Sequence, residues 1–521
     1  MAILDLGGVA SMSLPIVRPS SRRSGALRNR LSAVCCAFAL AGTAAPVLAG
    51  EPWLEVGDSS LRSDVEILAA HSLIDGPTTT WPLPAGGILA GLSDPDAIRR
   101  QPAYVQAAAA RVLAALDHSG VGGSVQARVT SQTDAVRGFD DQARNQSDVG
   151  AGVEWAGDGL NARLKVGEQS RVDGRQGRFA LDGSYVSGRV DNWLIYAGLV
   201  DQWYGPGWNS SLILSNNARP FPKIGIMRDD PHAFQTPWLS WLGPWQINLF
   251  GGVLDDPRVA SDPGYIALRV SIVPVDGLEL AVTRDLMVCG SGHACDPAKT
   301  FFHFDNSDAN PNNGVDASTI ELKYTRAIGP VLVSPYAQFY NRDTGPFDHS
   351  FTSHLYGTSL AGAFGTEGSR WRLTAEYTDS VPTLNFLDGG NIYGPAYNSY
   401  RYPGDGLRYD GRALGFSLDS DSKLLSLAAS LTDTQGWSYR LTYYQAQINS
   451  SQLANGTGQY DPANAFNAVS ARPVRINEIA AGLTVPLEGI SLSGTLRGQD
   501  RQVFPQTGGT ASAELDVSYR F

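Results

Sequence analysis

The final stretch, Ala511-Ser512-Ala513-Glu514-Leu515-Asp516-Val517-Ser518-Tyr519-Arg520-Phe521, alternates apolar and polar residues. Because successive side chains of a strand point to opposite faces, this pattern predicts a strand with one apolar and one polar face. The same period of two recurs over 162–166 and 371–378. An apolar face of this kind points toward a core in a soluble β-sandwich and toward lipid in a membrane barrel.

The lengths of the connections favour the membrane barrel. Long connections at 132–148, 285–317, 379–423 and 449–475 alternate with tight turns such as 156–159, 274–277 and 486–489. Long loops at one end and short turns at the other are typical of outer-membrane barrels, so we predict an all-β transmembrane barrel of about 18 antiparallel strands. The predicted strands begin near Val121, Val149, Leu160, Arg178, Asn192, Pro222, Trp245, Tyr265, Leu278, Ser318, Val331, Gly357, Arg370, Leu424, Trp437, Ile476, Ile490 and Ser512.

This alternation of long and short connections makes three further predictions. It requires a membrane-crossing strand near Ile224, although the stretch 222–228 is short and contains a glycine. It makes the connection 229–244 an exception, since a tight turn is expected there, and we expect this segment to fold against the barrel end or the helical segment. It places the loop that contains Cys289 and Cys295 on the extracellular side.

The composition agrees with many strands and turns. The chain has 57 glycines, 9% aromatic and 17% charged residues. Its net charge of -11 does not favour nucleic-acid binding. Residues 1–49 resemble an export signal, with arginines before the apolar run 31–40 and a cleavage site after Ala49. An N-terminal membrane anchor is the alternative, but the run is short and is followed by Gly42 and Pro46.

A helical segment precedes the strands. Leu61, Val65, Leu68 and Leu73 follow helical spacing, and a second helix is predicted from Asp96 to Asp117 after an Asp94-Pro95 start. The proline-rich sequence 81–84 predicts an extended link between them. The predicted organisation is a signal peptide at 1–49, a periplasmic helical domain at 50–120 and an outer-membrane barrel at 121–521 with a plugging loop near 201–221.

Two polar loops raise the question of a disulfide or a bound metal ion. In an exported protein, Cys289 and Cys295 favour a disulfide, whereas a metal site with His293 would lack a ligand. The acidic loop does not have the spacing of a calcium-binding EF-hand, so a solvated loop is the simpler interpretation. Its carboxylates and amides are Asp305, Asp308, Asn310, Asn312 and Asp316. We predict no cofactor and no metal.

The densest motif is DQWYGPGWNSSLILSNNARPFP at 201–222, followed by TPWLSWLGPW at 236–245. This region resembles the capsule-assembly Wzi family, whose pattern here is an aromatic pair, GPGW, a Ser-Leu segment and SNNARP. Further similarity lies at 409–415, 419–422 and 447–449, so the resemblance spans essentially the whole mature chain. Tyr204 stands where the family pattern has a second tryptophan. The resemblance implies an 18-stranded outer-membrane barrel with a periplasmic helical bundle, a closed lumen and a lectin role in attaching or organising capsular polysaccharide.

Two interpretations of the 201–222 motif remain open. Aromatic rings stack on sugars, and amides or guanidinium groups bind hydroxyls, so these residues could contact polysaccharide directly. Alternatively, the glycines at 205 and 207 shape a loop that fills the lumen. The candidate residues are Trp203, Tyr204, Trp208, Asn209, Asn216, Asn217 and Arg219.

A second candidate surface is the tyrosine-rich loop at 391–409. Its arginines could pair with uronate carboxylates of an acidic polysaccharide, while its tyrosines offer rigid contact area. The alternative is an aromatic girdle at the membrane interface. The candidate residues are Tyr397, Tyr400, Arg401, Tyr402, Arg408 and Tyr409.

We expect a non-enzymatic outer-membrane lectin, since the sequence lacks the G-x-S-x-G, H-E-x-x-H and phosphate-loop motifs. Neighbouring aspartates at 229–230 and 255–256 do not establish the separated carboxylate pair of a glycosidase. A channel for small solutes is the alternative function, and a barrel hydrolase of glycans or lipids is a third. Expected partners are capsular or extracellular polysaccharide, outer-membrane lipid and, through the terminal Phe521, the barrel assembly machinery.

Overall fold

The computed structural model describes residues 50–157, 159–170, 178–293, 295–302, 314–342, 352–385, 389–399, 401–402, 405–450, 467–503 and 509–521. The expected signal peptide, residues 1–49, lies outside this set. Within it, the strands form one closed barrel in which β27 (Ala511–Arg520) pairs antiparallel with β4 (Gly120–Thr130). Closure gives every strand a hydrogen-bonded neighbour on both sides, as a barrel in lipid requires.

The described barrel has 18 antiparallel strand positions, as predicted. The segments β7 and β8 both pair with β6, β16 extends β15, and β20 pairs with the end of β19. The remaining barrel segments are β5 (Ser147–Ala156), β6 (Leu160–Gln169), β7 (Arg178–Ala180), β8 (Tyr185–Val190), β9 (Trp193–Gly198), β11 (Lys223–Arg228), β12 (Trp245–Val253), β13 (Gly264–Val275), β14 (Leu278–Val288), β15 (Val315–Tyr324), β16 (Arg326–Ile328), β17 (Val331–Arg342), β18 (Thr352–Phe364), β19 (Ser369–Asn385), β20 (Gly389–Asn391), β23 (Lys423–Thr432), β24 (Ser438–Ile448), β25 (Val474–Pro486) and β26 (Ile490–Gln499).

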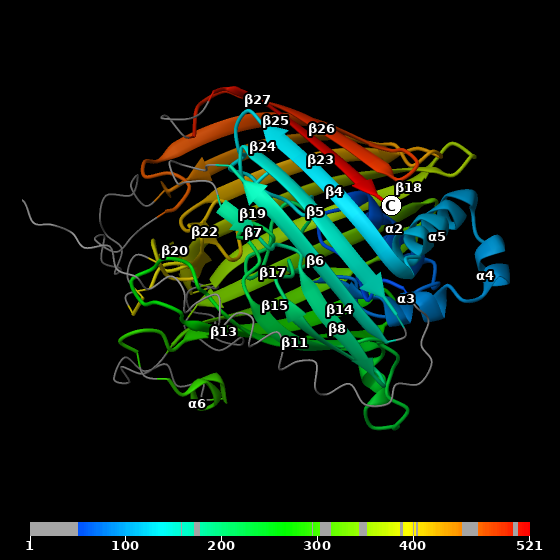
Figure 1. The fold of residues 1–521 in the computed structure, drawn as a ribbon, viewed down its shortest axis with the longest axis horizontal. Helices are drawn as coiled ribbons and strands as arrows, with labels where there is room; N and C mark the ends of the chain where they lie inside the picture. The colour runs from blue at the N-terminus through cyan, green and yellow to red at the C-terminus, as the bar shows by residue number, and fades with distance from the viewer. Residues whose placement is uncertain are drawn as a thin grey trace, which may run out of the picture. The chain divides into compact units, whose positions relative to one another are not determined.

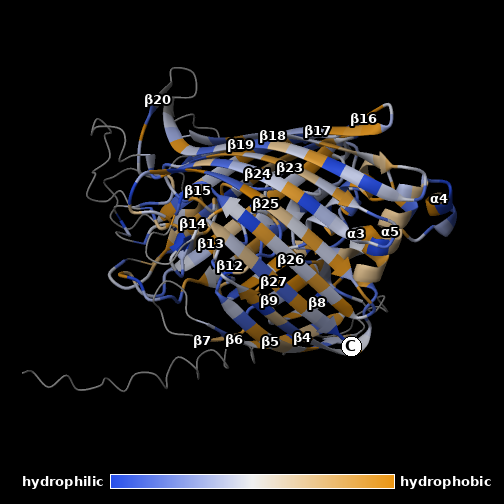
Figure 2. Cartoon of the chain, turned by 90° about the horizontal axis from the view of Figure 1, so that it is seen from above, coloured by the Kyte–Doolittle hydropathy of each residue, from blue (hydrophilic) through white to orange (hydrophobic). Residues whose placement is uncertain are grey.

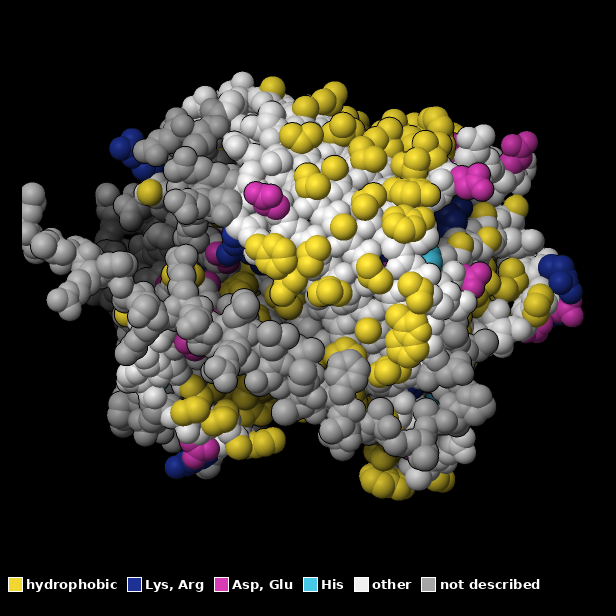
Figure 3. Space-filling view, viewed as in Figure 1, with side chains coloured by type: hydrophobic (Ala, Val, Ile, Leu, Met, Phe, Trp, Pro, Cys, Tyr) yellow, Lys and Arg dark blue, Asp and Glu magenta, His cyan; other side chains and the backbone are white. Residues whose placement is uncertain are grey.

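The apolar faces of the strands point outward. On β27, Leu515 and Val517 are exposed, while Asp516 points inward and pairs with Arg128 of β4. Figure 2 shows the resulting alternation of hydrophobic and hydrophilic residues along neighbouring strands, and Figure 3 shows hydrophobic side chains spread over the outer wall. The last residue continues the pairing, since the Phe521 backbone exchanges two hydrogen bonds with Gly123.

The two ends of the barrel differ as the connections predict. The N-terminal helical segment and the C-terminus lie at one end, which we call the turn end, whereas the long connections and the helix α6 (Pro297–Phe302) lie at the other, the loop end (Figure 1). The predicted strand near Ile224 is confirmed as β11, which pairs with both β9 and β12. The connection 229–244 contacts the helical segment, as predicted, because the Gly86 and Gly87 amides donate to Asp229.

The helical segment contains α2 (Ser59–Ala70), α3 (Ala85–Gly91), α4 (Pro95–Arg99) and α5 (Ala103–Leu116). The prediction of one helix from Asp96 to Asp117 was wrong, because Pro102 interrupts it. Proline lacks an amide hydrogen and disfavours the helical conformation of the residue before it, so the helix ends and restarts. The Asp94 cap is confirmed, with its carboxylate accepting from the Asp96 amide at 2.9 Å. No helix of the described segments is long and apolar enough to span a membrane.

Three two-stranded sheets lie outside the barrel wall. The predicted extended link at 81–84 supplies strands to two of them: β2 (Thr80–Trp81) pairs with β10 (Trp203–Tyr204), and β3 (Leu83–Pro84) pairs with β1 (Trp53–Leu54). The third joins β21 (Arg408–Tyr409) to β22 (Arg412–Ala413). The link therefore connects the helical segment to the 201–222 motif.

The outward face of β27 makes the first prediction. We expect Leu515→Arg to destabilise the barrel folded in vesicles by about 2–4 kcal/mol, the cost of an arginine near the bilayer midplane. The same substitution at Leu487, in the turn between β25 and β26, is expected to cost only about 0–1 kcal/mol. Urea titration of the barrel in phosphatidylcholine vesicles measures both, and equal costs would contradict a lipid-facing β27.

Candidate functional site: the plug and the loop end

Residues 201–222, which we call the plug, run through the barrel interior. Trp203, Tyr204 and Trp208 are all buried. The Trp208 amide donates to Glu376 Oε2 at 2.8 Å, and the Leu212 amide donates to Gln338 Oε1 at 2.8 Å. Since Glu376 and Gln338 are inward-facing residues of β19 and β17, the plug is bonded directly to the lumen wall.

Local backbone geometry explains the Gly-Pro-Gly sequence. Gly205 has a φ of 144°, and a Cβ there would lie 2.8 Å from the Gln338 amide nitrogen. A Cβ at Gly207 would lie 2.2 Å from the Ser210 carbonyl oxygen. Both positions therefore favour glycine, Gly205 because of its positive φ and Gly207 because a side chain would clash with the plug's own backbone at Ser210. The Trp203 indole then closes the turn by donating to the Gly207 carbonyl at 3.1 Å.

Arg62 of α2 holds the plug from the helical side. Its guanidinium donates to the carbonyls of Pro206 and Gly207, each at 2.8 Å. The same group lies 4.4 Å from the Trp208 ring centroid, and Arg372 of β19 lies at the same distance from that ring. A buried tryptophan between two guanidinium groups combines apolar burial with cation–π attraction.

Two acidic residues of α2 pair with the barrel wall. Asp64 accepts from Arg370 at 2.6 Å and from Arg111 of α5 at 2.8 Å. Glu66 lies 2.6 Å from Lys323 and 3.0 Å from Arg372. Burial alone would raise the pKa of Glu66, but the charges of Lys323 and Arg372 lower it to about 2. These pairs attach α2 to β15 and β19.

The other plug candidates also face protein. Asn209 accepts from Arg440 at 3.0 Å, and the Asn216 and Asn217 side chains donate to the backbone carbonyls of Phe139 and Ala413. Arg219 forms a bidentate pair with Asp182. Every one of these residues is thus occupied by a contact within the barrel, and direct sugar contact by the plug stays a prediction.

The tyrosine-rich loop also folds inward. Tyr397 is only 1% exposed; its hydroxyl donates to the Leu212 carbonyl at 2.6 Å and accepts from the Phe416 amide at 2.8 Å. Burial raises the pKa of this phenol. Tyr402 and Tyr409 join the same buried apolar cluster. The membrane-girdle interpretation is therefore wrong for these three tyrosines, because their rings pack inside the barrel rather than against lipid.

The arginines of this loop differ in their surroundings. Arg408 is buried and forms a bidentate pair with Asp419, at 2.6 and 2.7 Å. Arg401 is partly exposed, and one of its nitrogens donates to the Gly314 carbonyl at 3.2 Å. Tyr400 lies outside the described residues. Of the candidate residues of this loop that the structure describes, Arg401 is the one that is not buried.

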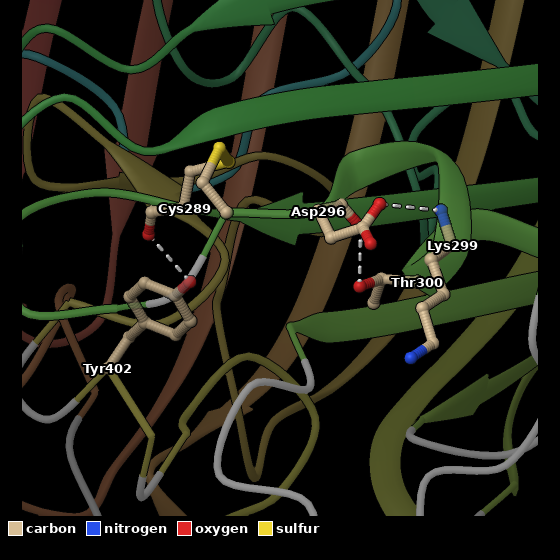
Figure 4. Close-up of a disulfide and its surroundings, with 6 residues drawn as sticks. Cys289, Asp296, Lys299, Thr300 and Tyr402 are labelled. Carbon is tan, nitrogen blue, oxygen red and sulfur yellow. Dashed lines mark hydrogen bonds between the residues drawn. A yellow bond between two sulfur atoms is a disulfide. The ribbon is translucent and has the colours of Figure 1, made fainter.

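The cysteine loop packs onto the tyrosine-rich loop. Cys289 and Cys295 form a disulfide, which removes both thiols as ligands for a metal site with His293. The Tyr402 hydroxyl donates to the Cys289 carbonyl at 2.9 Å, and Asp296 begins α6 by accepting from the Lys299 amide (Figure 4). The His293 ring stacks on Tyr402 with centroids 4.2 Å apart. The disulfide loop and the tyrosine-rich loop therefore form one layer at the loop end.

The aspartates considered for catalysis or calcium binding have other partners. Asp229 pairs with Arg189, Asp256 pairs with Arg258, and Asp255 accepts from the Tyr409 hydroxyl at 2.6 Å. Asp316 lies 3.0 Å from Arg284, whereas Asp305, Asp308, Asn310 and Asn312 lie outside the described residues. Within the described ranges, no group of three or more His, Cys, Asp or Glu side chains is placed to hold a metal ion.

The charged residues of α2 are functional elements that the sequence reasoning missed. Arg62, Asp64 and Glu66 are buried, although their polarity would ordinarily place them on a solvent-facing side. The available signal was the polar inward face predicted for β19, which includes Arg372 and Glu376. A polar lumen wall requires polar partners, so a charged helix at the start of the chain was a candidate for that role.

Comparisons with known proteins place these features in a family context. The family model described as capsule assembly protein Wzi matches residues 117–513. An uncharacterized 55.8 kDa protein in the cps region of Klebsiella pneumoniae is 26% identical over 344 residues, which is 62% of this chain. The match spans 65% of the length of that relative.

The fold is also similar to a solved structure. That structure is Wzi of Escherichia coli, described as an outer membrane protein involved in group 1 capsule assembly and a carbohydrate-binding β-barrel. The TM-score is 0.75 at 20% sequence identity, and the match covers 90% of this chain and 99% of the other. At this identity the similarity establishes the barrel fold.

The buried pairs of Glu66 make the second prediction. We expect Glu66→Gln to destabilise the docking of α2 by about 3–5 kcal/mol, because it leaves buried cations without a counter-charge. Hydrogen exchange of the α2 amides in detergent-solubilised protein measures the loss. Asp96→Asn is the control, since the Asp96–Arg99 pair is exposed and is expected to contribute at most about 1 kcal/mol.

The same experiment has a pH dependence. A carboxylate with a lowered pKa contributes stability above its unfolded pKa, and this contribution is lost as the pH falls through the folded value of about 2. We therefore expect the Glu66 contribution to be fully present from pH 7 down to the ordinary pKa of 4.5, to decrease below it and to disappear near pH 2. Loss of the difference between wild type and Glu66→Gln already at pH 5 would contradict the buried ion pairs.

Proposed function

Since the chain belongs to the capsule assembly protein Wzi family, we propose that it is a non-enzymatic outer-membrane lectin that attaches or organises capsular or extracellular polysaccharide at the cell surface. The observation that carries this proposal is the filled lumen. The plug and α2 bond to inward-facing residues of the wall, and Tyr397 of the tyrosine-rich loop bonds to the plug. A barrel occupied in this way acts as a scaffold for its ends, whereas solute passage needs a continuous aqueous lumen.

We place the polysaccharide at the loop end. There the stacked His293–Tyr402 pair and the disulfide give a rigid base, and Arg401 supplies a partly exposed cation. A guanidinium group can form two hydrogen bonds with a uronate carboxylate, and rigid aromatic layers limit the entropy lost on binding. In this proposal the buried tyrosines support the binding surface from inside the barrel. Arg401 is the residue that contacts the acidic sugar.

The orientation follows from the lengths of the connections. Long loops face the outside of outer-membrane barrels and short turns face the periplasm, so the helical segment belongs in the periplasm. The terminal strand β27, with outward aromatic residues Tyr519 and Phe521, suits recognition by the barrel assembly machinery. The aspartates considered as acids all have side-chain partners: Asp229 and Asp256 pair with arginines, Asp230 lies near His232, and Asp255 accepts from Tyr409.

Retention of polysaccharide by the native host tests this role. We expect deletion of the gene to shift polysaccharide from the cell-bound fraction to the medium, and the wild-type gene to restore retention. Arg401→Gln should restore it poorly, because the variant loses the cation for the acidic polymer. Arg326→Gln, at an exposed position of β16 at the opposite end, should restore it fully. Unchanged cell-bound polysaccharide after deletion would refute the role.

A channel is the second candidate, and its test is electrical. We expect the purified protein to show almost no steady conductance in planar lipid bilayers, because the plug and α2 occupy the lumen. An outer-membrane porin with an open aqueous lumen is the positive control. Steady single-channel steps from the wild-type protein would favour the channel. Shortening of purified polysaccharide after incubation would instead favour the hydrolase.

A further inference from the structure

The connection 229–244 is the one departure from short turns at the turn end. Other connections there are brief, such as the turn at Gly277 between β13 and β14 and the turn at Gly489 between β25 and β26. This connection instead carries a 3-10 turn, η2 (Ser240–Leu242), between β11 and β12. Neither the closure of the barrel nor the filling of its lumen requires the extra residues.

The base of this connection is fixed to the rest of the molecule. Asp229 pairs with Arg189 of β8 at 2.6 Å and accepts from the Gly86 amide of α3 at 3.0 Å. The Arg228 guanidinium lies 3.9 Å from the Trp245 ring centroid and donates to the Trp245 carbonyl at 2.8 Å. Phe234 stacks on the same tryptophan ring with centroids 4.6 Å apart. The tip of the connection is therefore presented from a rigid base.

The tip exposes two large aromatic side chains. Trp238 is 73% exposed and Trp241 is 64% exposed. The sequence AFQTPWLSWLGPWQI at 233–247 contains no charged residue. Tryptophan has a large apolar ring and one hydrogen-bond donor, so two such exposed rings in an uncharged segment indicate an apolar surface that water does not normally cover.

The position of the tip identifies what covers it. The Val273 amide donates to the Pro244 carbonyl at 2.8 Å, which joins the connection to the end of β13. Nearby outward residues of the wall, Val190, Trp193 and Val275, are themselves exposed. Hydrophobic side chains project where the ribbon turns between β11 and β12, at the lower right of Figure 3. The apolar tip therefore extends from a base that adjoins outward-facing apolar residues of the wall.

We propose that the connection 229–244 is a membrane anchor that places Trp238 and Trp241 in the interfacial region of the phospholipid leaflet at the turn end. Tryptophan favours this region because its ring is apolar and its indole N–H remains hydrogen-bonded. Because Asp229 also binds α3, the anchor holds the helical segment close to the membrane surface. The inference uses the membrane placement of the barrel but does not depend on the polysaccharide role.

A probe at Ser240, which lies exposed between the two tryptophans, tests the anchor. The full chain carrying Ser240→Cys is labelled with an environment-sensitive fluorophore and placed in phosphatidylcholine nanodiscs. We expect bromine on the phospholipid acyl chains to quench this label, as it quenches a label at Val153→Cys on the outer wall of β5. A label at Ser93→Cys, exposed in the helical segment, should be quenched by aqueous iodide only.

The tryptophans are tested in the same nanodiscs. Adding Trp238→Ser and Trp241→Ser to the Ser240 variant should abolish quenching by the brominated lipid and restore quenching by iodide. The anchor is refuted if the Ser240 label in the intact connection responds to iodide alone, as a surface for a periplasmic protein would. If the Val153 label also escapes the brominated lipid, the membrane placement of the barrel fails instead.

Discussion

Lipid outside the barrel is the constraint on which the rest of the structure depends. It forces the strands to close and to turn their apolar side chains outward, so the polar side chains face inward. Inside, charged groups removed from water must be paired. Arg372 shows the result, since this one wall residue lies 3.0 Å from Glu66 of α2 and 4.4 Å from the Trp208 ring of the plug. The charges of the wall and of α2 are therefore complementary.

The features that lipid imposes were predictable from the sequence. The alternation over 513–521 identified β27, and the alternation of connection lengths identified β11 around Ile224 despite its short sequence. Both predictions succeed because lipid requires an apolar outward face of every strand. The same reasoning identified the connection 229–244 as irregular, because it is long at a place where the alternation of connection lengths requires a tight turn.

The contents of the lumen were less predictable, because they depend on which distant segments meet. A helix pattern does not show that Arg62 reaches the carbonyls of Pro206 and Gly207. The burial of Tyr397 against Leu212 likewise joins segments 185 residues apart. Even the break at Pro102 was missed, because helical spacing on both sides of a proline resembles one continuous helix. Local patterns thus predicted the wall, and tertiary contacts determined its contents.

The filled lumen also supports the loop end, where we propose that polysaccharide binds. Tyr397 of the tyrosine-rich loop links the Leu212 carbonyl of the plug to the Phe416 amide, and the Ser215 amide of the plug donates to the Leu414 carbonyl. The plug in turn is bonded to Glu376 and Gln338 of the wall. Force applied to the loops is therefore transmitted through hydrogen bonds to the strands and to α2. An open pore would leave the loops without this internal support.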